Sequence, residues 1–355
     1  MPQRVLLTGA NGFIAQHILG QFLSEGSSVR AVVRTQSSAD QLRSVFPSYP
    51  ASKLDFALVP DITSPGAFDD VLVSDPPFDV VLHTASPFNF RKGSSNLDFL
   101  DPAVKGTTEI LRGVARKAPS VRRVVVTSSM AAVIDVARPA VSSPPKVYTE
   151  KDWCEISRRD AETTEHPQLP YVASKTFAER AAWELVAEET PGFDLVTINP
   201  PMVYGPVYDA SVFASPEGLN QSNFNLYSGF LGPELTPESP VPPEGLHLYV
   251  DVRDVARAHL LAATRPAAGG NRFVVSPGGV SSQKIASILR ERLPGLQGRI
   301  PRGDPEKTAL PEGIFGVDSS LSREVLGLEY TKLEDTFLDA AAQFIGIEER
   351  AARAA

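Results

Sequence analysis

Tyr171 and Lys175 are the two residues whose types and spacing point most directly to chemistry. Residues four apart on a helix lie on the same face. A carbonyl group that accepts a hydride becomes an alkoxide and needs a proton, which a phenol can donate. The pKa of an ordinary tyrosine is about 10, and a neighbouring ammonium group lowers it. The pair therefore predicts a general acid with a tuning cation, against the alternative of a surface lysine beside a half-buried tyrosine.

Ser128 and Ser129 offer a hydroxyl group that could hold the carbonyl oxygen. They follow the apolar run 121–126, which predicts a buried strand, and they precede the helix predicted from Tyr171. A hydroxyl donor stabilises an oxygen that gains negative charge. In a parallel sheet, ligands bind at the carboxyl ends of the strands, where these groups are expected.

The first residues predict a strand, a glycine turn and a helix. The apolar run 5–7 ends at Gly9, which permits a sharp turn, and Gly12 lets the backbone approach a pyrophosphate. Ala15 is small enough for the helix to pack on the strand, and the helix dipole then faces the phosphates. This pattern predicts a dinucleotide site, against the alternative of an ordinary turn.

The end of the second predicted strand, 29–33, bears on the choice of cofactor. NAD enzymes usually place an acidic residue there, but this chain has Arg34 and no acid before Asp40. A guanidinium group can pair with the 2′-phosphate of NADP. The sequence therefore predicts NADPH, and a solvated arginine is the alternative.

The elements that position these groups can be predicted from the sequence. Patterns typical of strands and of helices alternate through the first 200 residues. Alternating units of this kind predict an α/β fold, a Rossmann-type doubly wound parallel sheet with a smaller C-terminal lobe that caps the substrate. Residues 1–200 and about 246–264 are assigned to the NADP-binding domain, and 201–245 and 265–345 to the substrate lobe. Strands are expected near 5–7, 29–33, 54–59, 80–86, 121–126, 195–198 and 273–276, and helices at 97–118, 171–189, 220–230, 283–293 and 336–344.

Composition excludes several classes of protein. The chain has 355 residues and a net charge of −8, which disfavours nucleic acid and anionic membranes as partners. Its single cysteine, Cys154, allows no intrachain disulfide and no cysteine-based zinc site, and no metal is expected. The first strand begins too early for a signal peptide, and no long apolar run predicts a membrane helix, so a cytoplasmic monomer or homodimer is expected.

Several motifs together carry a resemblance to a known family. The chain resembles the extended short-chain dehydrogenase/reductases, in particular the dihydroflavonol reductase-like branch and the fungal NADPH-dependent methylglyoxal and 3-methylbutanal reductases. The resemblance spans Val5 to about Phe344. The motifs are Thr8–Ala15, Asp61–Ile62, His83–Phe88, Thr127–Ser129, Tyr171 with Lys175, Asn199–Pro200 with Tyr204–Pro206, and Asp251–Ala256.

The resemblance implies a role for each matching residue. Tyr171 would be the acid, Lys175 its tuner and a ribose ligand, and Ser129 the residue that positions the carbonyl. His83 is interpreted as a core histidine rather than a catalytic one. Cofactor contacts are implied for Gly9, Ala10, Asn11, Gly12, Phe13, Ile14, Asp61, Ile62, Ala85, Thr127, Val203 and Ser222, beside Arg34, Tyr171 and Lys175.

The expected substrate pocket departs from that family. Its members often carry aromatic residues where Met130, Ile134 and Met202 stand, while Phe88 and Tyr204 are aromatic here. Methionine is unbranched and adaptable, so we expect a pliable aliphatic pocket that accepts bulky ketones. Methionines that only fill the core are the alternative.

The favoured activity is NADPH-dependent reduction of an aldehyde, ketone or keto ester to an alcohol, which can be chiral. A second interpretation is an NAD-dependent sugar-nucleotide epimerase or dehydratase, which Arg34 and the apolar pocket set disfavour. A third is a non-catalytic NADP-sensing protein of the same fold, and the intact Tyr171 and Lys175 pair argues against it.

Overall fold

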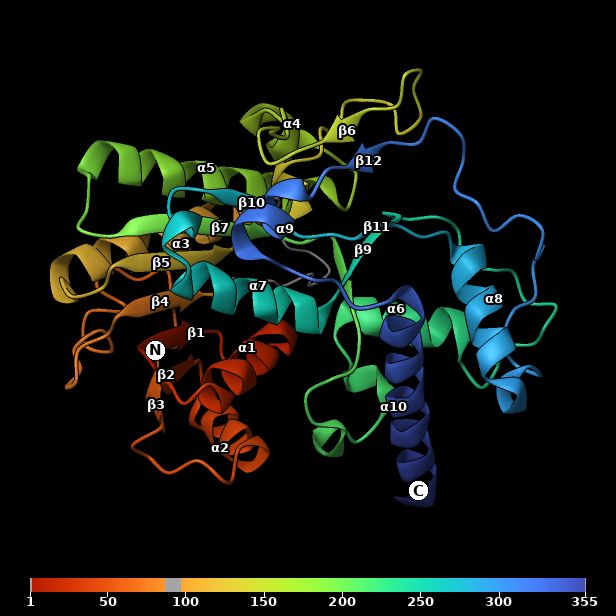
Figure 1. Cartoon of the computed structure of the whole chain (residues 1–355), viewed down its shortest axis with the longest axis horizontal. Helices are drawn as coiled ribbons and strands as arrows, with labels where there is room; N and C mark the ends of the chain where they lie inside the picture. The colour runs from red at the N-terminus through yellow and green to blue at the C-terminus, as the bar shows by residue number, and fades with distance from the viewer. Residues whose placement is uncertain (1, 87–96, 355) are drawn as a thin grey trace.

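Seven parallel strands form the main sheet of the computed structural model, which describes residues 2–86 and 97–354 (Figure 1). The order across the sheet is β3, β2, β1, β4, β5, β7, β10. The expected Rossmann-type parallel sheet is thereby confirmed. The strands are β1 (Arg4–Thr8), β2 (Ser28–Val33), β3 (Leu54–Leu58), β4 (Val80–His83), β5 (Arg123–Thr127), β7 (Asp194–Asn199) and β10 (Arg272–Val274).

Helices cover both faces of this sheet because its strands are apolar on both sides. Val5 and Leu7 of β1 pack in one core cluster and Leu6 packs in another, as alternation along a strand requires. The first cluster includes side chains of α1 (Phe13–Ser24), α2 (Gln36–Val45), α7 (Val252–Thr264) and α9 (Ser320–Leu326). The second includes side chains of α3 (Leu97–Lys117) and α5 (Leu169–Glu189).

The strand order reverses at β1, which pairs with β2 on one side and with β4 on the other. Ligands of doubly wound sheets bind in the crevice at this reversal, beyond the carboxyl ends of the strands. The turn after β1 begins at Gly9, and Ala85 follows β4. The topology therefore brings two of the predicted cofactor segments together.

A second group of elements lies beside the main sheet (Figure 1). Side chains from α6, α8 and α10 share a third apolar cluster that includes Leu226, Leu289 and Phe344. This group contains β8 (Met202–Tyr204), β9 (Leu248–Asp251) and β11 (Gly278–Gly279) in a small sheet, with α6 (Gln221–Phe230), α8 (Ser282–Arg292) and α10 (Leu333–Ala354). Elsewhere β6 (Val147–Tyr148) pairs with β12 (Gly316–Val317), and α4 (Arg158–Thr163) precedes α5.

The sheets that β9 and β10 join cut across the predicted domain ranges. Strand β10 falls in the range assigned to the substrate lobe, yet it pairs with β7 at the edge of the main sheet. Strand β9 falls in the range assigned to the NADP-binding domain, yet it pairs with β8 and β11. Strands of three and four residues carry too little periodicity to show which sheet they join. None of the described helices is long and apolar enough to cross a membrane.

Thr190, just after α5, offers a test of backbone strain. It is the one described residue other than glycine with a positive φ, 41°, and its N–H group donates to the carbonyl oxygen of Val186. A β-branched residue in the left-handed region is strained by about 1–2 kcal/mol, which glycine avoids.

We expect Thr190→Gly to raise the free energy of unfolding by about 1 kcal/mol, measured by urea denaturation. Glu188→Gly is the control, because this exposed residue lies within the helix, where glycine lowers stability by about 1 kcal/mol. A loss of stability in Thr190→Gly as large as in the control would contradict the strain.

Candidate active site

Tyr171, Lys175 and Ser129 meet at the carboxyl edge of the main sheet. Helix α5 carries Tyr171 and Lys175 on one face, and the Lys175 Nζ atom lies 5.9 Å from the centre of the Tyr171 ring. Ser129 follows β5 and its hydroxyl group is hydrogen-bonded to Tyr171. The Nζ atom donates to the Oγ atom of Ser86, 3.2 Å away. The structure thus assembles the three predicted catalytic residues from two segments about 40 residues apart.

Burial opposes charge on both titratable groups of this trio. It raises the pKa of Tyr171, and the hydrogen bond with Ser129 offsets part of the rise. Burial also lowers the pKa of Lys175 to about 8, although the Glu179 carboxylate acts in the opposite direction. Tyr171 therefore holds its proton at neutral pH, and Lys175 is a cation that loses its charge just above neutral pH.

The two neighbouring serines differ in what they contact. The Ser128 hydroxyl is buried and donates to the Glu179 carboxylate. The Ser129 hydroxyl accepts a hydrogen bond from the backbone of Ala131 at 3.1 Å and also reaches Tyr171. Of the two, Ser129 is the one whose hydroxyl group faces the predicted acid.

The turn after β1 is built for close backbone contact. Gly9 has a φ of +65°, and a Cβ atom there would lie 2.9 Å from the backbone of Ala85. The N–H group of Gly12 donates to the carbonyl oxygen of Gly9 at 2.9 Å, and that of Ala10 to Val32 at 3.2 Å. Gly12 caps α1 without a side chain, and the first turn of that helix holds no acidic residue. The helix N-terminus is therefore suited to a phosphate group.

The predicted ligands of the adenosine end lie after β2 and β3. Arg34 is exposed, and its charge helps to lower the pKa of Asp61, after the larger effect of hydrogen bonds from Thr63. The Thr35 side chain caps α2 by accepting from the N–H group of Ser38 at 3.3 Å. Ile62 packs over Gly106, where a Cβ atom would lie 2.7 Å from the isoleucine.

The remaining cofactor candidates fall into two groups. Ser222 and Val203 are far apart in the sequence but in contact, because the serine hydroxyl donates to the valine carbonyl oxygen at 2.5 Å. The Thr127 hydroxyl is bonded to the Nε2 atom of His259 at 2.7 Å, while Nδ1 donates to the carbonyl oxygen of Val255. The Thr127 side chain is therefore directed to α7, which leaves its backbone for contact with a ligand.

His83 is buried, in agreement with its interpretation as a core histidine. Its Nδ1 atom is 2.9 Å from the Thr8 hydroxyl, and its Nε2 atom has no hydrogen-bond partner among the described residues. Burial lowers its pKa to about 3, with a smaller effect from Lys175, so the ring is neutral. It lines a cavity of about 20 Å³ beside Lys175, large enough for one water molecule.

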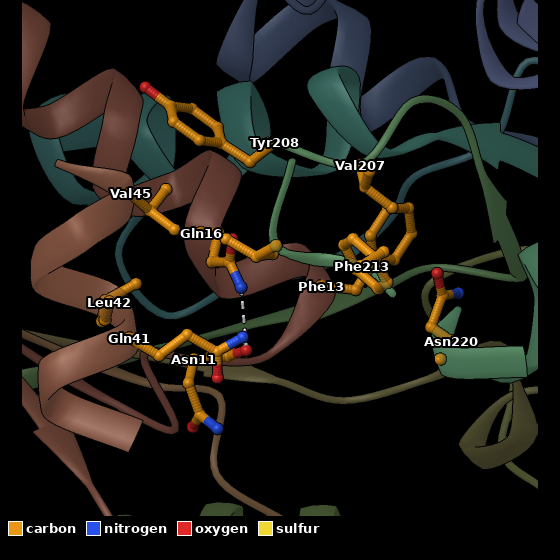
Figure 2. Close-up of a pocket in the computed structure, with 12 residues that line it drawn as sticks. Asn11, Phe13, Gln16, Gln41, Leu42, Val45, Val207, Tyr208, Phe213 and Asn220 are labelled. Carbon is orange, nitrogen blue, oxygen red and sulfur yellow. Dashed lines mark hydrogen bonds between the residues drawn. The ribbon is translucent and has the colours of Figure 1, made fainter. Parts of the chain in front are cut away.

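A larger cavity, of about 250 Å³, lies beside the glycine turn (Figure 2). Figure 2 shows Leu42 and Val45 of α2 on one side, and Phe13 and Phe213 on the other. The Gln16 side chain donates to the carbonyl oxygen of Asn11 across its floor. None of the three predicted catalytic residues lines this cavity, so it does not mark the place of the predicted chemistry.

The predicted substrate residues are not gathered in one place. Met130 is fully buried and shares a core cluster with Tyr148, Leu248 and Val274, against which Ile134 packs. The structure thus favours the core-filling alternative for Met130. Met202 and Tyr204 are half-buried on β8, and the Tyr204 ring centre lies 5.4 Å from that of Phe337. Phe88 lies outside the described residues.

Sequence reasoning missed Glu179 and Arg272 behind the trio and gave no role to Asn199. Glu179 and Asn199 are buried and hydrogen-bonded to each other, and Arg272 forms an ion pair with Glu179 at 2.6 Å. The available signal was the spacing of Glu179, four residues after Lys175 on the same helix face. Within the described chain, no group of three or more His, Cys, Asp or Glu side chains is arranged to hold a metal ion.

Comparison with known proteins finds a family model and several relatives that match most of this chain. The model of the NAD dependent epimerase/dehydratase family matches residues 5–276. The chain is 38% identical over 345 residues to "Ketoreductase azaE" of Aspergillus niger, covering 97% of this chain and 98% of the relative. It is 38% identical over 352 residues to the "NADPH-dependent methylglyoxal reductase GRE2" of Saccharomyces cerevisiae, covering 98% and 99%.

Solved structures agree with the sequence relatives. The structure of yeast methylglyoxal/isovaleraldehyde reductase Gre2 complexed with NADPH matches with a TM-score of 0.88 and 37% identity, covering 98% of this chain and 99% of that one. MoeE5 in complex with UDP-glucose and NAD matches with a TM-score of 0.67 at 22% identity, which shows a shared fold alone.

The two glycines of the turn should respond differently to an added methyl group. Gly9→Ala places a Cβ atom against backbone at a left-handed φ, so we expect it to lower the free energy of unfolding by about 2 kcal/mol. Gly12 has a φ of −72°, and its added Cβ would lie 3.2 Å from the Gly9 carbonyl oxygen. We expect Gly12→Ala to cost less stability and to weaken dinucleotide binding about tenfold by occupying the approach to the phosphates.

Urea denaturation and fluorescence titration with NADPH measure the two effects. Equal losses of stability in both variants would contradict the distinction drawn between these glycines.

Proposed function

The chain belongs to the NAD dependent epimerase/dehydratase family, within the extended short-chain dehydrogenase/reductases, and we propose that it is an NADPH-dependent carbonyl reductase. Its substrates are aldehydes, ketones or keto esters, which it reduces to alcohols. The observation that carries this proposal is the hydrogen bond between Ser129 and Tyr171, with the Lys175 cation one helical turn away. These three groups can hold a carbonyl oxygen and protonate it.

The residues around the crevice fit the cofactor. The turn at Gly9 leaves no room for a side chain, and the N-terminus of α1 presents N–H groups without a competing acid. Arg34 stands exposed at the end of β2, where it can pair with a 2′-phosphate. NADPH, when bound, supplies the hydride.

The catalytic trio binds the carbonyl oxygen and supplies the proton. The Ser129 hydroxyl and the Tyr171 phenol both donate to the carbonyl oxygen as it gains negative charge. Tyr171 carries its proton at neutral pH because burial raises its pKa. Once the proton is transferred, the charge of Lys175 stabilises the phenolate. The three residues therefore provide binding, proton donation and charge compensation in a single place.

The second group of elements supplies the cap over this centre in our proposal. Met202 and Tyr204 are half-buried on β8, directly after the β7 segment that contacts Ser129 through Asn199. Their side chains would form part of the substrate pocket. The unbranched Met202 would allow the pocket to adapt to bulky ketones.

The first test is reduction by the catalytic variants, followed by NADPH oxidation at fixed pH. Tyr171→Phe removes the proton donor, and we expect it to lower kcat by about a thousandfold. Ser129→Ala removes one donor to the oxygen and should lower kcat by about a hundredfold. Tyr148→Phe is the matched control, because the Tyr148 ring packs on Phe315 and its hydroxyl group donates to the carbonyl oxygen of Asp135.

Wild-type activity across a panel of aldehydes, ketones and keto esters is the reference for these values. Turnover in Tyr171→Phe at the wild-type rate would sink the mechanism. Binding of NADPH without reduction of any carbonyl in the panel would favour a non-catalytic protein. Tightly bound NAD in the purified protein would favour an epimerase or dehydratase.

A second test concerns the cofactor phosphate. Arg34→Gln removes the guanidinium group, so we expect the KM for NADPH to rise about tenfold while the KM for NADH stays unchanged. Arg43→Gln is the control, since Arg43 is an exposed residue of α2 that stacks on Phe56. The assignment fails if both arginine variants change the two KM values alike.

A further inference from the structure

Glu179 is a buried carboxylate directly behind the catalytic trio. It lies on α5, one turn after Lys175 and two turns after Tyr171, with 2% of its surface exposed. A carboxylate removed from water is costly unless donors surround it. Its two oxygens accept from five side chains, namely Ser128, Thr197, Asn199, Trp183 and Arg272.

These donors connect Glu179 to the backbone of Ser129. The Asn199 amide donates to the Glu179 carboxylate at 2.7 Å and to the carbonyl oxygen of Ser129 at 3.2 Å. The Ser128 hydroxyl donates to the same carboxylate oxygen as Asn199. The carboxylate thereby holds both residues that immediately follow β5.

Arg272 balances the charge of Glu179. The Arg272 Nε atom donates to the carboxylate at 2.6 Å, and its Nη1 atom donates to the carbonyl oxygens of Glu150 and Asp152 at 2.6 and 2.8 Å. The guanidinium group lies 3.6 Å from the centre of the Trp153 ring. A buried ion pair of this kind is stable only while each ion keeps its partner and its other hydrogen bonds. The pair therefore fixes the positions of both side chains.

Glu179 also faces Lys175 across the small cavity. The titratable side chains that line this cavity are His83 of β4 and Lys175 and Glu179 of α5, while α3 contributes Ala103 and Thr107. His83 is neutral. Glu179 is the one carboxylate among the described residues that line the small cavity. Lys175 donates to Ser86 rather than forming an ion pair, and the carboxylate therefore acts on it through space.

We infer that Glu179 is a positioning residue for the reduction proposed above: paired with Arg272, its carboxylate keeps Lys175 charged and fixes the Ser128–Ser129 segment against Tyr171. This inference rests on the proposed function for its effect on catalysis. Its effect on the charge of Lys175 does not depend on the proposed function.

Two variants separate the carboxylate from the packing around it. Glu179→Gln alone would leave the buried Arg272 without its counterion, so we choose the double variant Glu179→Gln/Arg272→Gln, which removes both charges. Arg272→Gln alone is its comparison, since it loses the guanidinium group but keeps the carboxylate. Both proteins are first checked for cooperative unfolding.

The measurements are the pH profile of kcat and the titration of Lys175 followed by NMR of ¹³C-labelled lysine, assigned with Lys175→Arg. The wild-type Lys175 should titrate with a pKa of about 8. In the double variant we expect this pKa, and the alkaline limb of kcat, to fall by about one pH unit, because the charged lysine loses its carboxylate. We also expect kcat to fall about tenfold as Ser129 loses its support. In Arg272→Gln the alkaline limb should not move to lower pH.

The pair Arg123 and Asp194 provides a matched structural control. It joins the amino ends of β5 and β7 at 2.6 Å, and Arg123 is buried. Arg123→Gln/Asp194→Asn should lower stability and leave both titrations in place. An equal shift in this control, or a Lys175 titration unchanged in the Glu179 double variant, would overturn the inference. If the wild type reduces no carbonyl, the proposed function fails while the NMR titration still decides the role of Glu179.

Discussion

The Glu179 carboxylate is buried between the main sheet and α5, and a charge in such a place needs hydrogen-bond donors from the elements around it. Its partners come from α5, β7, β10 and the residue that follows β5, so these elements have little freedom to shift relative to one another. Leaving one buried donor unpaired costs more than a typical hydrogen bond contributes, so the network specifies geometry more than it adds stability. The three proposed catalytic residues lie on or next to the elements that this network holds together.

The sequence predicted the scaffold well because its signals are local. Apolar runs marked the strands of the main sheet, and the spacing of Gly9 and Gly12 identified the turn where the sheet order reverses. The face shared by Tyr171 and Lys175 followed from helical spacing alone. The position of Ser129 followed from the end of β5, since parallel strands present their carboxyl ends together.

The parts that escaped prediction depend on contacts between distant segments. Glu179 lies in a helix rich in alanine and charged residues, where a glutamate is usually solvated, and its partner Arg272 is 93 residues away. For Met130 the sequence left a place in the substrate pocket and a place in the core both open, and its packing with Tyr148, Leu248 and Val274 depends on separate elements. Strand β10 is too short to reveal which sheet it joins. Pairings of this kind are set by the assembled fold and leave no periodic trace in the chain.

The place of β10 has a consequence for how the protein is made. A ribosome releases Glu179 well before Arg272, so the growing chain holds the carboxylate before its cation is available. Until β10 adds to the sheet, α5 cannot bury Glu179 without leaving its charge without a counterion. The first 264 residues contain Ser129, Tyr171 and Lys175, yet they lack β10, the strand that carries the partner of Glu179. Completion of the main sheet therefore waits for a segment encoded after β8, α6 and β9 of the second group of elements, so the main sheet and that group are expected to fold together.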